Sequence, residues 1–222
     1  MPRESRPLVG VPNASEELAL LADGYGRVAG LDEAGRGCLA GPVVAAAVIL
    51  PHSAYSLQGS MAEVRDSKML LPSVRESLFE EIRCQAVGVG VGVVSHHYID
   101  EYGIVPATKL AMLAAICNLP VLPDYLLIDY LSLPSVVVPQ KPIVHGDAIC
   151  LSIAAASIVA KVIRDHLMVE QDVCYPGYGF ARNKGYGTPS HLDSLRQLGP
   201  CAIHRRTFAP VNCLFPLQDQ LL

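Results

Sequence analysis

Residues 43–50 read Val-Val-Ala-Ala-Ala-Val-Ile-Leu, and none of their side chains is polar. Gly41-Pro42 precedes this run and Pro51 follows it, so it has the length and the sharp boundaries of a β-strand. A strand that is apolar at every position has both faces buried, because alternate side chains point to opposite sides of a sheet. The chain is therefore expected to fold around a sheet that is covered on both faces.

Segments with strand and helix patterns follow one another along the rest of the chain. We expect strands at residues 25–32, 86–94 and 125–129, with short extended pieces at 136–138 and 143–145. We expect helices at residues 15–22, 72–85, 104–119, 151–171 and 188–198. The predicted fold class is α/β, a mixed sheet flanked by helices in a single domain, 1–222, with a loose tail over residues 1–13 and a C-terminal helical lobe over about 175–222.

The composition is apolar, with 51% hydrophobic and 17% charged residues, so a membrane protein has to be considered. The most apolar windows, 38–50 and 104–119, are interrupted by Gly, Pro or Lys and fall short of the roughly 20 apolar residues of a spanning helix. Near the N-terminus, Arg3, Glu4 and Arg6 stand where a signal peptide has its apolar core. We expect a cytoplasmic protein.

The seven cysteines are widely spread and include no Cys-x-x-Cys pair. An odd number with this spacing is typical of reduced thiols in a core, and it argues against a structural zinc site, whose ligands usually come in close pairs. The cysteines stand at positions 38, 84, 117, 150, 174, 201 and 213.

The formal net charge of −4 does not by itself indicate a nucleic-acid partner, but the charge is unevenly distributed. Residues 161–210 contain seven Lys or Arg and four Asp or Glu, a local charge of +3, whereas the remainder of the chain is acidic. This distribution suits a protein that contacts a phosphate backbone with one part and metal ions with the other. An ordinary solvated helix face explains it equally well.

Acidic side chains stand at the ends of two predicted strands. Asp32 and Glu33 end the first strand, Asp129 ends the strand at 125–129, and Asp147 follows one strand later. Open α/β sheets bind their ligands at the carboxyl ends of strands, and carboxylates gathered there repel one another unless cations hold them. Hard oxygen ligands of this kind select Mg²⁺ or Mn²⁺. As a statistical matter, acids at strand ends more often cap helices or face water.

Longer motifs surround these acids. Residues 28–37 read Val-Ala-Gly-Leu-Asp-Glu-Ala-Gly-Arg-Gly, and residues 40–47 read Ala-Gly-Pro-Val-Val-Ala-Ala-Ala. Further blocks are Asp66-Ser67-Lys68, Leu127-Ile128-Asp129, Gly146-Asp147 with residues 153–165, residues 175–179, residues 184–188 with His191, and residues 204–208. In this order, and over residues 28 to about 210, the blocks resemble the ribonuclease HII family.

The resemblance implies a ribonuclease H-like fold with a mixed five-stranded sheet, and a catalytic site of four metal-binding carboxylates, Asp32, Glu33, Asp129 and Asp147. It implies Mg²⁺ or Mn²⁺ as the cofactor, and RNA/DNA hybrids or DNA containing ribonucleotides as the substrate. The implied reaction is endonucleolytic hydrolysis on the 5′ side of a ribonucleotide, which leaves a 3′-hydroxyl and a 5′-phosphate and serves ribonucleotide excision repair. Two divalent ions would activate the water and stabilise the leaving oxygen.

The resemblance also assigns contacts to the substrate. Main-chain amides of Gly35, Arg36 and Gly37, together with Tyr186, would sense the step from RNA to DNA. Only the 2′-hydroxyl distinguishes the two at one nucleotide, and glycines let main-chain groups approach it closely. Backbone or phosphate contacts would come from three cations, Lys68, Arg164 and Lys184.

The sequence departs from the family pattern at a few positions. His145 stands where a lysine is common, Tyr130 stands where a small residue is common, and residues 69–71 are more apolar than usual. We interpret His145 as a packed loop histidine, with a phosphate contact or a pH-dependent charge as the alternative. Tyr130 would narrow the site and so affect the range of substrates.

Three other functions fit the sequence less well. A nucleotide-dependent oxidoreductase needs a Gly-x-Gly-x-x-Gly fingerprint, whereas Gly88, Gly90 and Gly92 alternate inside a predicted strand and indicate close sheet packing. A nucleic-acid-binding protein without catalysis is expected to have lost carboxylates, and all four are present. The sister type, ribonuclease HIII, carries a long extra N-terminal domain, and we do not expect one ahead of Asp32.

We expect a monomer that makes no contact with membranes. The apolar segment 214–218, Leu-Phe-Pro-Leu-Gln, is compatible with docking on a partner such as a sliding clamp, and equally compatible with packing against the core.

Overall fold

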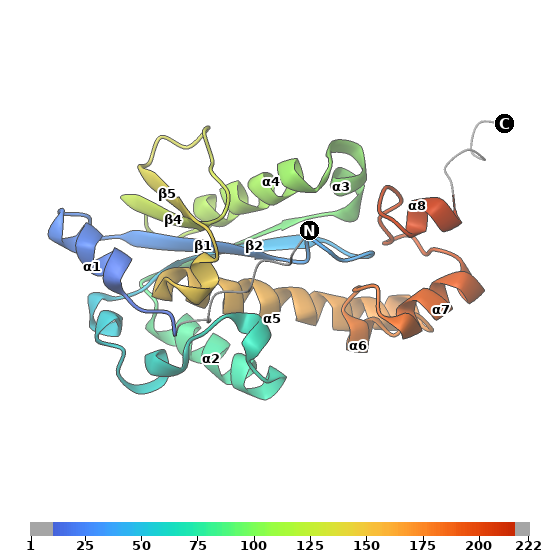
Figure 1. Ribbon diagram of the computed structural model, residues 1–222, viewed down its shortest axis with the longest axis horizontal. Coiled ribbons are helices and arrows are strands. Elements are labelled where there is room, and N and C mark those ends of the chain that lie inside the picture. The colour runs from blue at the N-terminus through green and yellow to red at the C-terminus, as the bar shows by residue number, and fades with distance from the viewer. Residues whose placement is uncertain (1–10, 216–222) are drawn as a thin grey trace, which may run out of the picture.

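The computed structural model describes residues 11–215 and is built on a five-stranded sheet with the order β3-β2-β1-β4-β5 (Figure 1). Neighbouring strands β1, β2 and β3 pair antiparallel, while β4 and β5 continue the sheet parallel to β1. The prediction of a mixed five-stranded sheet is confirmed. The strands are β1 (Val28–Ala34), β2 (Val43–Ile49), β3 (Gly88–Val94), β4 (Tyr125–Asp129) and β5 (Gln140–Ile143).

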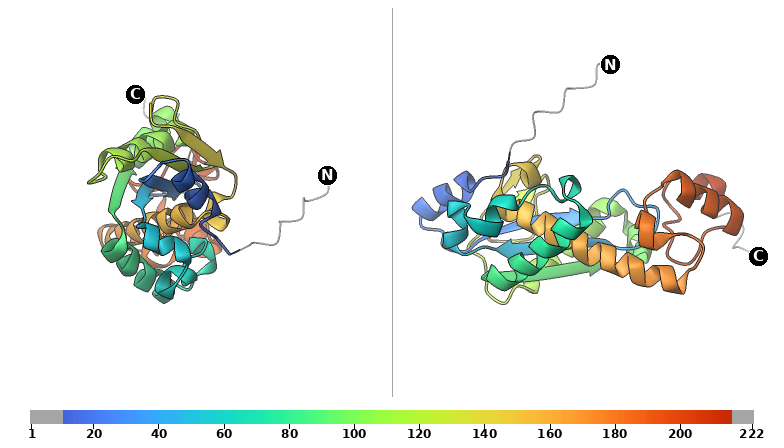
Figure 2. Two further views of the ribbon diagram at one scale, coloured as in Figure 1. Left: turned by 90° about the vertical axis from the view of Figure 1, so that its left-hand side faces the viewer. Right: turned by 90° about the horizontal axis from the view of Figure 1, so that it is seen from below.

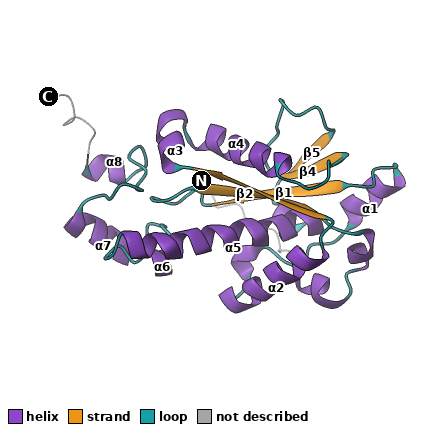
Figure 3. Cartoon of the chain, turned by 180° about the vertical axis from the view of Figure 1, so that it is seen from behind, coloured by secondary structure: helices purple, strands orange, loops and turns teal. Residues whose placement is uncertain are grey.

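Helices cover both faces of this sheet (Figures 1 and 3). The longest helix, α5 (Leu151–Cys174), lies on one face with α2 (Pro72–Gln85) outside it, and α4 (Ile104–Cys117) lies on the other face beside α3 (His96–Tyr102). Every residue of β2 is buried, because its side chains enter the hydrophobic core on both sides. The apolar run at residues 43–50 therefore has the environment that its sequence predicts.

The alternating glycines of β3 allow α4 to lie directly on the sheet. A Cβ atom on Gly90 would come within 2.1 Å of the Ala115 carbonyl oxygen, and one on Gly92 within 2.0 Å of the Ala111 carbonyl oxygen. Only glycine leaves room for this close approach. The interpretation of these glycines as a packing feature is confirmed.

The remaining helices are short. At the N-terminal side, α1 (Ser15–Ala22) packs near the start of α5, and the C-terminal lobe lies beyond the far end of α5 (Figure 2). The lobe contains α6 (Phe180–Asn183), α7 (Pro189–Leu198) and α8 (Val211–Leu214), and single 3₁₀ turns lie at η1 (His52–Ser56), η2 (Gly59–Glu63), η3 (Ser67–Met69) and η4 (Gly146–Ala148).

The first predicted strand has other boundaries in the structure. The first strand was expected at 25–32, but it begins at Val28 and continues to Ala34, so Asp32 and Glu33 lie inside β1 just before its end. Its start is displaced because the Asp124 carboxylate accepts the N–H groups of Gly26 and Arg27, which turns the chain there.

The prediction of extended segments at 136–138 and 143–145 is wrong. The strand is Gln140–Ile143, and the valines before it lie in a loop where Val137 is 99% exposed. The sequence pattern did not predict β5 because β5 is an edge strand, which tolerates Pro142 and needs no apolar run. Helix α4 ends two residues earlier than expected, and α5 continues three residues further.

Other expectations concern the termini and the membrane. Residues 1–10 of the predicted tail lie outside the described residues, but Asn13 is already fixed, since its N–H donates to the Ile149 carbonyl (2.9 Å). No helix within residues 11–215 is long and apolar enough to cross a membrane. All seven cysteines are free thiols.

Helix α1 holds the start of α5 through Glu17. This side chain is fully buried, and its Oε1 accepts both the N–H (2.8 Å) and the hydroxyl (2.7 Å) of Ser152. The second oxygen has no hydrogen-bond partner in the described part of the chain, and burial raises the pKa of the Glu17 carboxyl. Glu17 therefore acts as an N-terminal cap supplied by a distant part of the chain.

Replacement of Glu17 tests this cap. Glu17→Ala should lower the free energy of unfolding by about 1–3 kcal/mol, because the buried Ser152 N–H loses its acceptor. Glu17→Gln keeps an acceptor oxygen in the same place, so its free energy of unfolding should fall much less. Urea titrations of both variants check the difference, and equal losses would contradict a capping role.

Candidate active site

Four carboxylates gather at one edge of the sheet, where β1 and β4 end. Asp32 and Glu33 lie near the carboxyl end of β1, Asp129 is the last residue of β4, and Asp147 lies in η4 just after β5. Because β1 and β4 are parallel neighbours, their carboxyl ends meet at the same edge. The structure thus brings together the four acids that the sequence singled out.

One oxygen of each carboxylate is held by a protein donor. The donors are the Glu33 N–H to Asp32 (2.7 Å), the Gly146 N–H to Asp129 (2.8 Å), the Arg36 guanidinium to Glu33 (3.1 Å) and the Lys68 ammonium to Asp147 (2.9 Å). These bonds fix where the carboxylates stand while leaving each a further oxygen.

The site concentrates negative charge in a poorly solvated place. Burial, and then the charges of Glu33, Asp129 and Asp147, raise the pKa of Asp32 well above its ordinary value. Burial likewise raises the pKa values of Glu33 and Asp129. Both effects disfavour the ionised form, so a cation bound here would relieve an unfavourable arrangement.

Lys68 supplies part of the compensating charge. Desolvation lowers its pKa, but the hydrogen bond to Asp147 and the charges of Asp147, Asp66 and Asp32 outweigh this and raise the pKa of Lys68 overall. Its side chain is still 73% exposed, so the ammonium is accessible from outside while it contacts the site.

The donor set fits a hard divalent cation. Glu33 Oε2 is buried and has no hydrogen-bond partner within residues 11–215, which is a costly state for a carboxylate oxygen unless a ligand contacts it. All the candidate donors are carboxylate oxygens, the type that Mg²⁺ and Mn²⁺ prefer. Over residues 11–215 no three acidic, His or Cys side chains are already arranged around one point as metal ligands.

The Gly-Arg-Gly segment follows β1 directly. Gly35 has a positive φ of 96°, and a Cβ atom there would come within 2.0 Å of the Arg164 Nε, so glycine is required twice over. Arg36 turns back to Glu33, and Gly37 is exposed. No acceptor within residues 11–215 takes the N–H groups of Arg36 and Gly37.

The position of Arg164 corrects an expectation. Its side chain is fully buried and donates to the carbonyl oxygens of Pro42 (3.0 Å), Ala40 (3.1 Å) and Lys184 (2.8 Å). The guanidinium therefore cannot contact a phosphate of the substrate, and it instead ties the loop after β1 to the C-terminal lobe.

Arg205 was not recognised from the sequence as part of the site. It too is fully buried, and it donates to the carbonyl oxygens of Gly35 (2.7 Å), Arg36 (2.8 Å), Gly41 (3.1 Å) and Pro42 (3.2 Å). A basic residue in a basic stretch gave no signal that it would be buried.

Tyr186 lies beside the Gly-Arg-Gly segment. The Leu39 N–H donates to the Gly185 carbonyl (2.8 Å), which joins the loop after β1 to the segment 184–186. The Tyr186 ring is 5.2 Å from the Lys161 Nζ and is partly exposed, and burial raises the pKa of its phenol to about 12. The ammonium of Lys184 donates to the Ala181 carbonyl of its own lobe.

The two departures from the family pattern flank the carboxylates in strained backbone. Tyr130 and His145 have positive φ values of 56° and 57°, which side-chain-bearing residues seldom adopt. The interpretation of His145 as a packed histidine is wrong, because it is exposed. Tyr130 is also exposed, at 61%, directly after Asp129.

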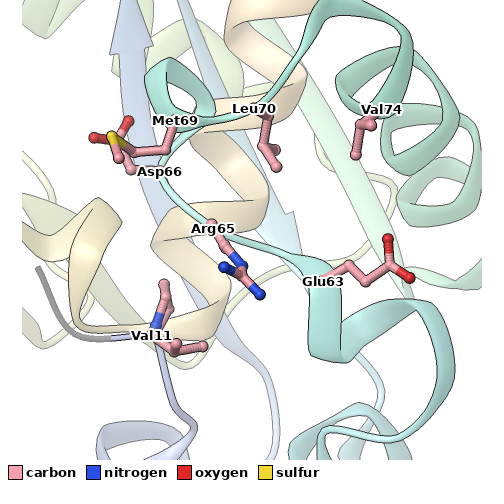
Figure 4. Close-up of a pocket in the computed structure, with 8 residues that line it drawn as sticks. Val11, Glu63, Arg65, Asp66, Met69, Leu70 and Val74 are labelled. Carbon is pink, nitrogen blue, oxygen red and sulfur yellow. The ribbon is translucent and has the colours of Figure 1, made fainter.

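A cavity of about 350 Å³ lies near this site, between the first described residues and the segment that leads into α2 (Figure 4). It contains none of the four carboxylates and meets the site only through Asp66, which neighbours Lys68. The lining residues are Val11, Pro12, Glu63, Arg65, Asp66, Met69, Leu70 and Val74.

Known proteins share both the sequence and the fold. The sequence model of the family described as Ribonuclease HII matches residues 29–211. The Ribonuclease HII of Dehalococcoides mccartyi (strain ATCC BAA-2266 / KCTC 15142 / 195) is 54% identical over 210 residues, which cover 94% of this chain and 98% of that protein.

Two solved structures agree with this. The ribonuclease H2 from Pyrococcus horikoshii OT3 is 26% identical with a TM-score of 0.69, covering 85% of this chain and 96% of that one. The RNase HII from Archaeoglobus fulgidus, solved in complex with PCNA, is 25% identical with a TM-score of 0.65, covering 82% and 95%.

The fold and these similarities define a nuclease of the ribonuclease H class. The chain belongs to the ribonuclease HII family, as the resemblance of its motifs indicates. The prediction of a ribonuclease H-like fold is confirmed.

The raised pKa values predict that Asp32→Asn increases the thermal stability of the metal-free protein, and that this increase depends on pH. Because the folded protein holds the Asp32 proton to higher pH than the unfolded chain, this carboxyl contributes stability below its ordinary pKa of 3.8 that is lost as the pH rises through the folded value. In chelator near pH 8, Asp32→Asn should melt a few degrees higher, at about 2–4 °C for each kcal/mol.

The gain should shrink as the pH falls below 3.8, where the wild-type carboxyl becomes protonated in the unfolded chain as well as in the folded protein. Asp193→Asn, on the exposed surface of α7, is the control and should change little. A melting temperature of Asp32→Asn at or below that of the wild type near pH 8 would show that the carboxylates do not repel one another.

Proposed function

We propose that this enzyme hydrolyses the RNA strand of RNA/DNA hybrids and cuts on the 5′ side of single ribonucleotides in duplex DNA, leaving a 3′-hydroxyl and a 5′-phosphate. The observation that carries the proposal is the set of four carboxylates at the carboxyl edge of β1 and β4, next to a loop in which the N–H groups of Arg36 and Gly37 find no acceptor among residues 11–215. The first can support hydrolysis of a phosphodiester, and the second can recognise the sugar.

We propose a divalent metal site at the carboxylates. Asp32, Glu33, Asp129 and Asp147 would hold two ions, Mg²⁺ or Mn²⁺, which supply activation of water and stabilisation of the leaving oxygen. The unpartnered Glu33 Oε2 and the raised pKa of Asp32 support this assignment, since both mark oxygens that lack a counter-charge. The bonds from Arg36 and the Gly146 N–H keep two of the carboxylates in position.

Recognition of the ribonucleotide is assigned to Gly35, Arg36, Gly37 and Tyr186. Arg205 engages the carbonyl groups of Gly35 and Arg36, while the N–H groups of Arg36 and Gly37 have no acceptor in the described chain. Donors held in this way suit a 2′-hydroxyl oxygen, the group that distinguishes RNA from DNA. The half-exposed Tyr186 ring is available to stack on a neighbouring sugar or base.

Contacts to the nucleic-acid backbone are assigned to Lys68 and Lys184. The exposed Lys68 ammonium lies beside Asp147, where the charge of a bound phosphate would complement it. We infer a cytoplasmic monomer. The partner PCNA belongs to the Archaeoglobus protein, and for this chain a sliding clamp remains a prediction, because residues 216–218 of the proposed docking segment lie outside the described residues.

Cleavage of a DNA duplex that contains one ribonucleotide tests the function. With Mg²⁺ or Mn²⁺ we expect a single cut on the 5′ side of that ribonucleotide, and a chelator should abolish it. Asp129→Asn should fold normally and lose activity by at least about a hundredfold, because a charged oxygen ligand is gone. Denaturing gels of the labelled strand measure both results.

Folding of Asp129→Asn is followed by thermal melting, and an all-DNA duplex is the substrate control. Activity of Asp129→Asn close to that of the wild type would contradict the metal site. Binding of the duplex without any cut would move the function to nucleic-acid binding without catalysis.

A second prediction concerns Tyr186. Tyr186→Ala should reduce the preference for a single ribonucleotide over a continuous hybrid by about tenfold, because loss of one stacked ring costs about 1–3 kcal/mol. The ratio of kcat/KM on the two substrates measures it. A loss of equal size on both substrates would argue against a role in sensing the junction.

A further inference from the structure

Two histidines form a continuous hydrogen-bonded chain inside the C-terminal lobe. His191 on α7 and His204 are both fully buried, and their Nε2 atoms are 3.1 Å apart. His191 Nδ1 lies 2.8 Å from the Tyr186 carbonyl oxygen, and His204 Nδ1 lies 3.0 Å from the Cys201 backbone N. The chain therefore runs from Cys201 to the main chain of Tyr186.

The two ends of the chain fix the position of every proton. The Cys201 N–H can only donate, so His204 Nδ1 accepts, and the His204 proton is on Nε2. That proton is donated to His191 Nε2, which leaves the His191 proton on Nδ1. The Tyr186 carbonyl can only accept, and it receives this proton. The direction is consistent at each step only when both rings are neutral.

The surroundings keep the rings neutral. Both histidines pack against the ring of Phe180, and His204 also contacts Tyr178. Burial lowers the pKa of His191, and burial together with the neighbouring His191 lowers the pKa of His204 to about 4. The chain is thus a permanent structural element at physiological pH.

The hydrogen bond from His191 to Tyr186 completes a set of three hydrogen-bonded carbonyl groups, which lie beside the loop that contains the Gly-Arg-Gly segment. The carbonyl of Lys184 accepts from buried Arg164, that of Gly185 accepts from the Leu39 N–H, and that of Tyr186 accepts from His191. The Thr188 N–H also donates to Tyr186 (2.8 Å). His191 is the side chain in this set that directly holds the residue whose ring is exposed at the surface.

We propose that His191 is a positioning residue for substrate discrimination, which orients Tyr186 through the hydrogen bond from Nδ1 to its carbonyl, with His204 fixing the proton that makes this bond. The proposal rests on the function assigned to Tyr186 above. It places a determinant of specificity inside the lobe, on a side chain that the substrate does not touch.

Two substitutions distinguish the hydrogen bond at Nδ1 of His191 from the one at Nε2. In His191→Asn the side-chain NH₂ occupies the place of Nδ1 and can still donate to Tyr186, but the bond to His204 is lost. In His191→Gln the side-chain amide reaches the place of Nε2 and can still meet His204, but the bond to Tyr186 is lost. Each variant removes one hydrogen bond of the chain, so a merely structural role predicts similar effects.

The measurement is the ratio of kcat/KM for a duplex with one ribonucleotide to that for a continuous hybrid, with the metal-loaded full chain. His191→Gln should lower this ratio by roughly three- to tenfold, as expected for one net hydrogen bond, and His191→Asn should keep it within about twofold of the wild type. If His191→Gln does not fold, His191→Leu serves instead, since it also removes the donor to Tyr186; the same ratio should fall.

Tyr186→Ala is measured in the same assay, because it tests the role of Tyr186 separately from the positioning role of His191. If Tyr186→Ala lowers the ratio but His191→Gln and His191→Asn change it equally or not at all, the positioning role is overturned while the function of Tyr186 stands. If Tyr186→Ala leaves the ratio unchanged, the assignment of Tyr186 is itself wrong, and the positioning role is overturned with it.

Discussion

Like charges held together in a poorly solvated place set the main constraint on this fold. Asp32 is nearly fully buried, and the neighbouring carboxylates raise its pKa further. Such an arrangement opposes folding unless rigid surroundings enforce it. The surroundings here are the inner strands β1 and β4 with α5 packed against them, and β1 is in contact with α5 so closely that a Cβ atom on Gly30 would come within 2.1 Å of the Ser152 backbone. The charge that destabilises the metal-free protein is the same charge that would bind divalent ions.

Helix α5 and the C-terminal lobe each place a buried guanidinium group next to the loop after β1. Arg164 and Arg205 together donate to six different carbonyl groups, most of them in the loop after β1. A buried guanidinium is tolerated when its donors are satisfied, and its planar fork can hold several carbonyl groups in one arrangement. The carbonyl groups of this loop are thus occupied, whereas the N–H groups of Arg36 and Gly37 have no acceptor within residues 11–215. The two arginines therefore fix the shape of a loop that lies on another part of the chain.

Local sequence pattern predicted much of the fold because the elements concerned carry their own signals. The strand at 125–129 and the helices at 15–22 and 72–85 have the predicted boundaries, and the run at 43–50 is buried on both faces as expected. The sequence pattern did not predict strand boundaries that depend on pairing with neighbouring strands. Strand β5 is polar because it lies at the edge of the sheet, and β1 extends past Asp32 because it pairs with β2 as far as Ala34.

Short segments of the sequence were enough to predict the family, most of the elements and the four acids that gather at one edge of the sheet, because motif spacing and strand periodicity are local properties. The packing of distant segments decides which cations are exposed beside the carboxylates and which are buried. Lys68 and Arg164 look alike as basic residues in conserved-looking motifs, yet the Lys68 side chain is 73% exposed and Arg164 is fully buried. The reason is that burial depends on what packs against a side chain, and the carbonyl groups that surround Arg164 come from residues more than 120 positions away as well as from Lys184.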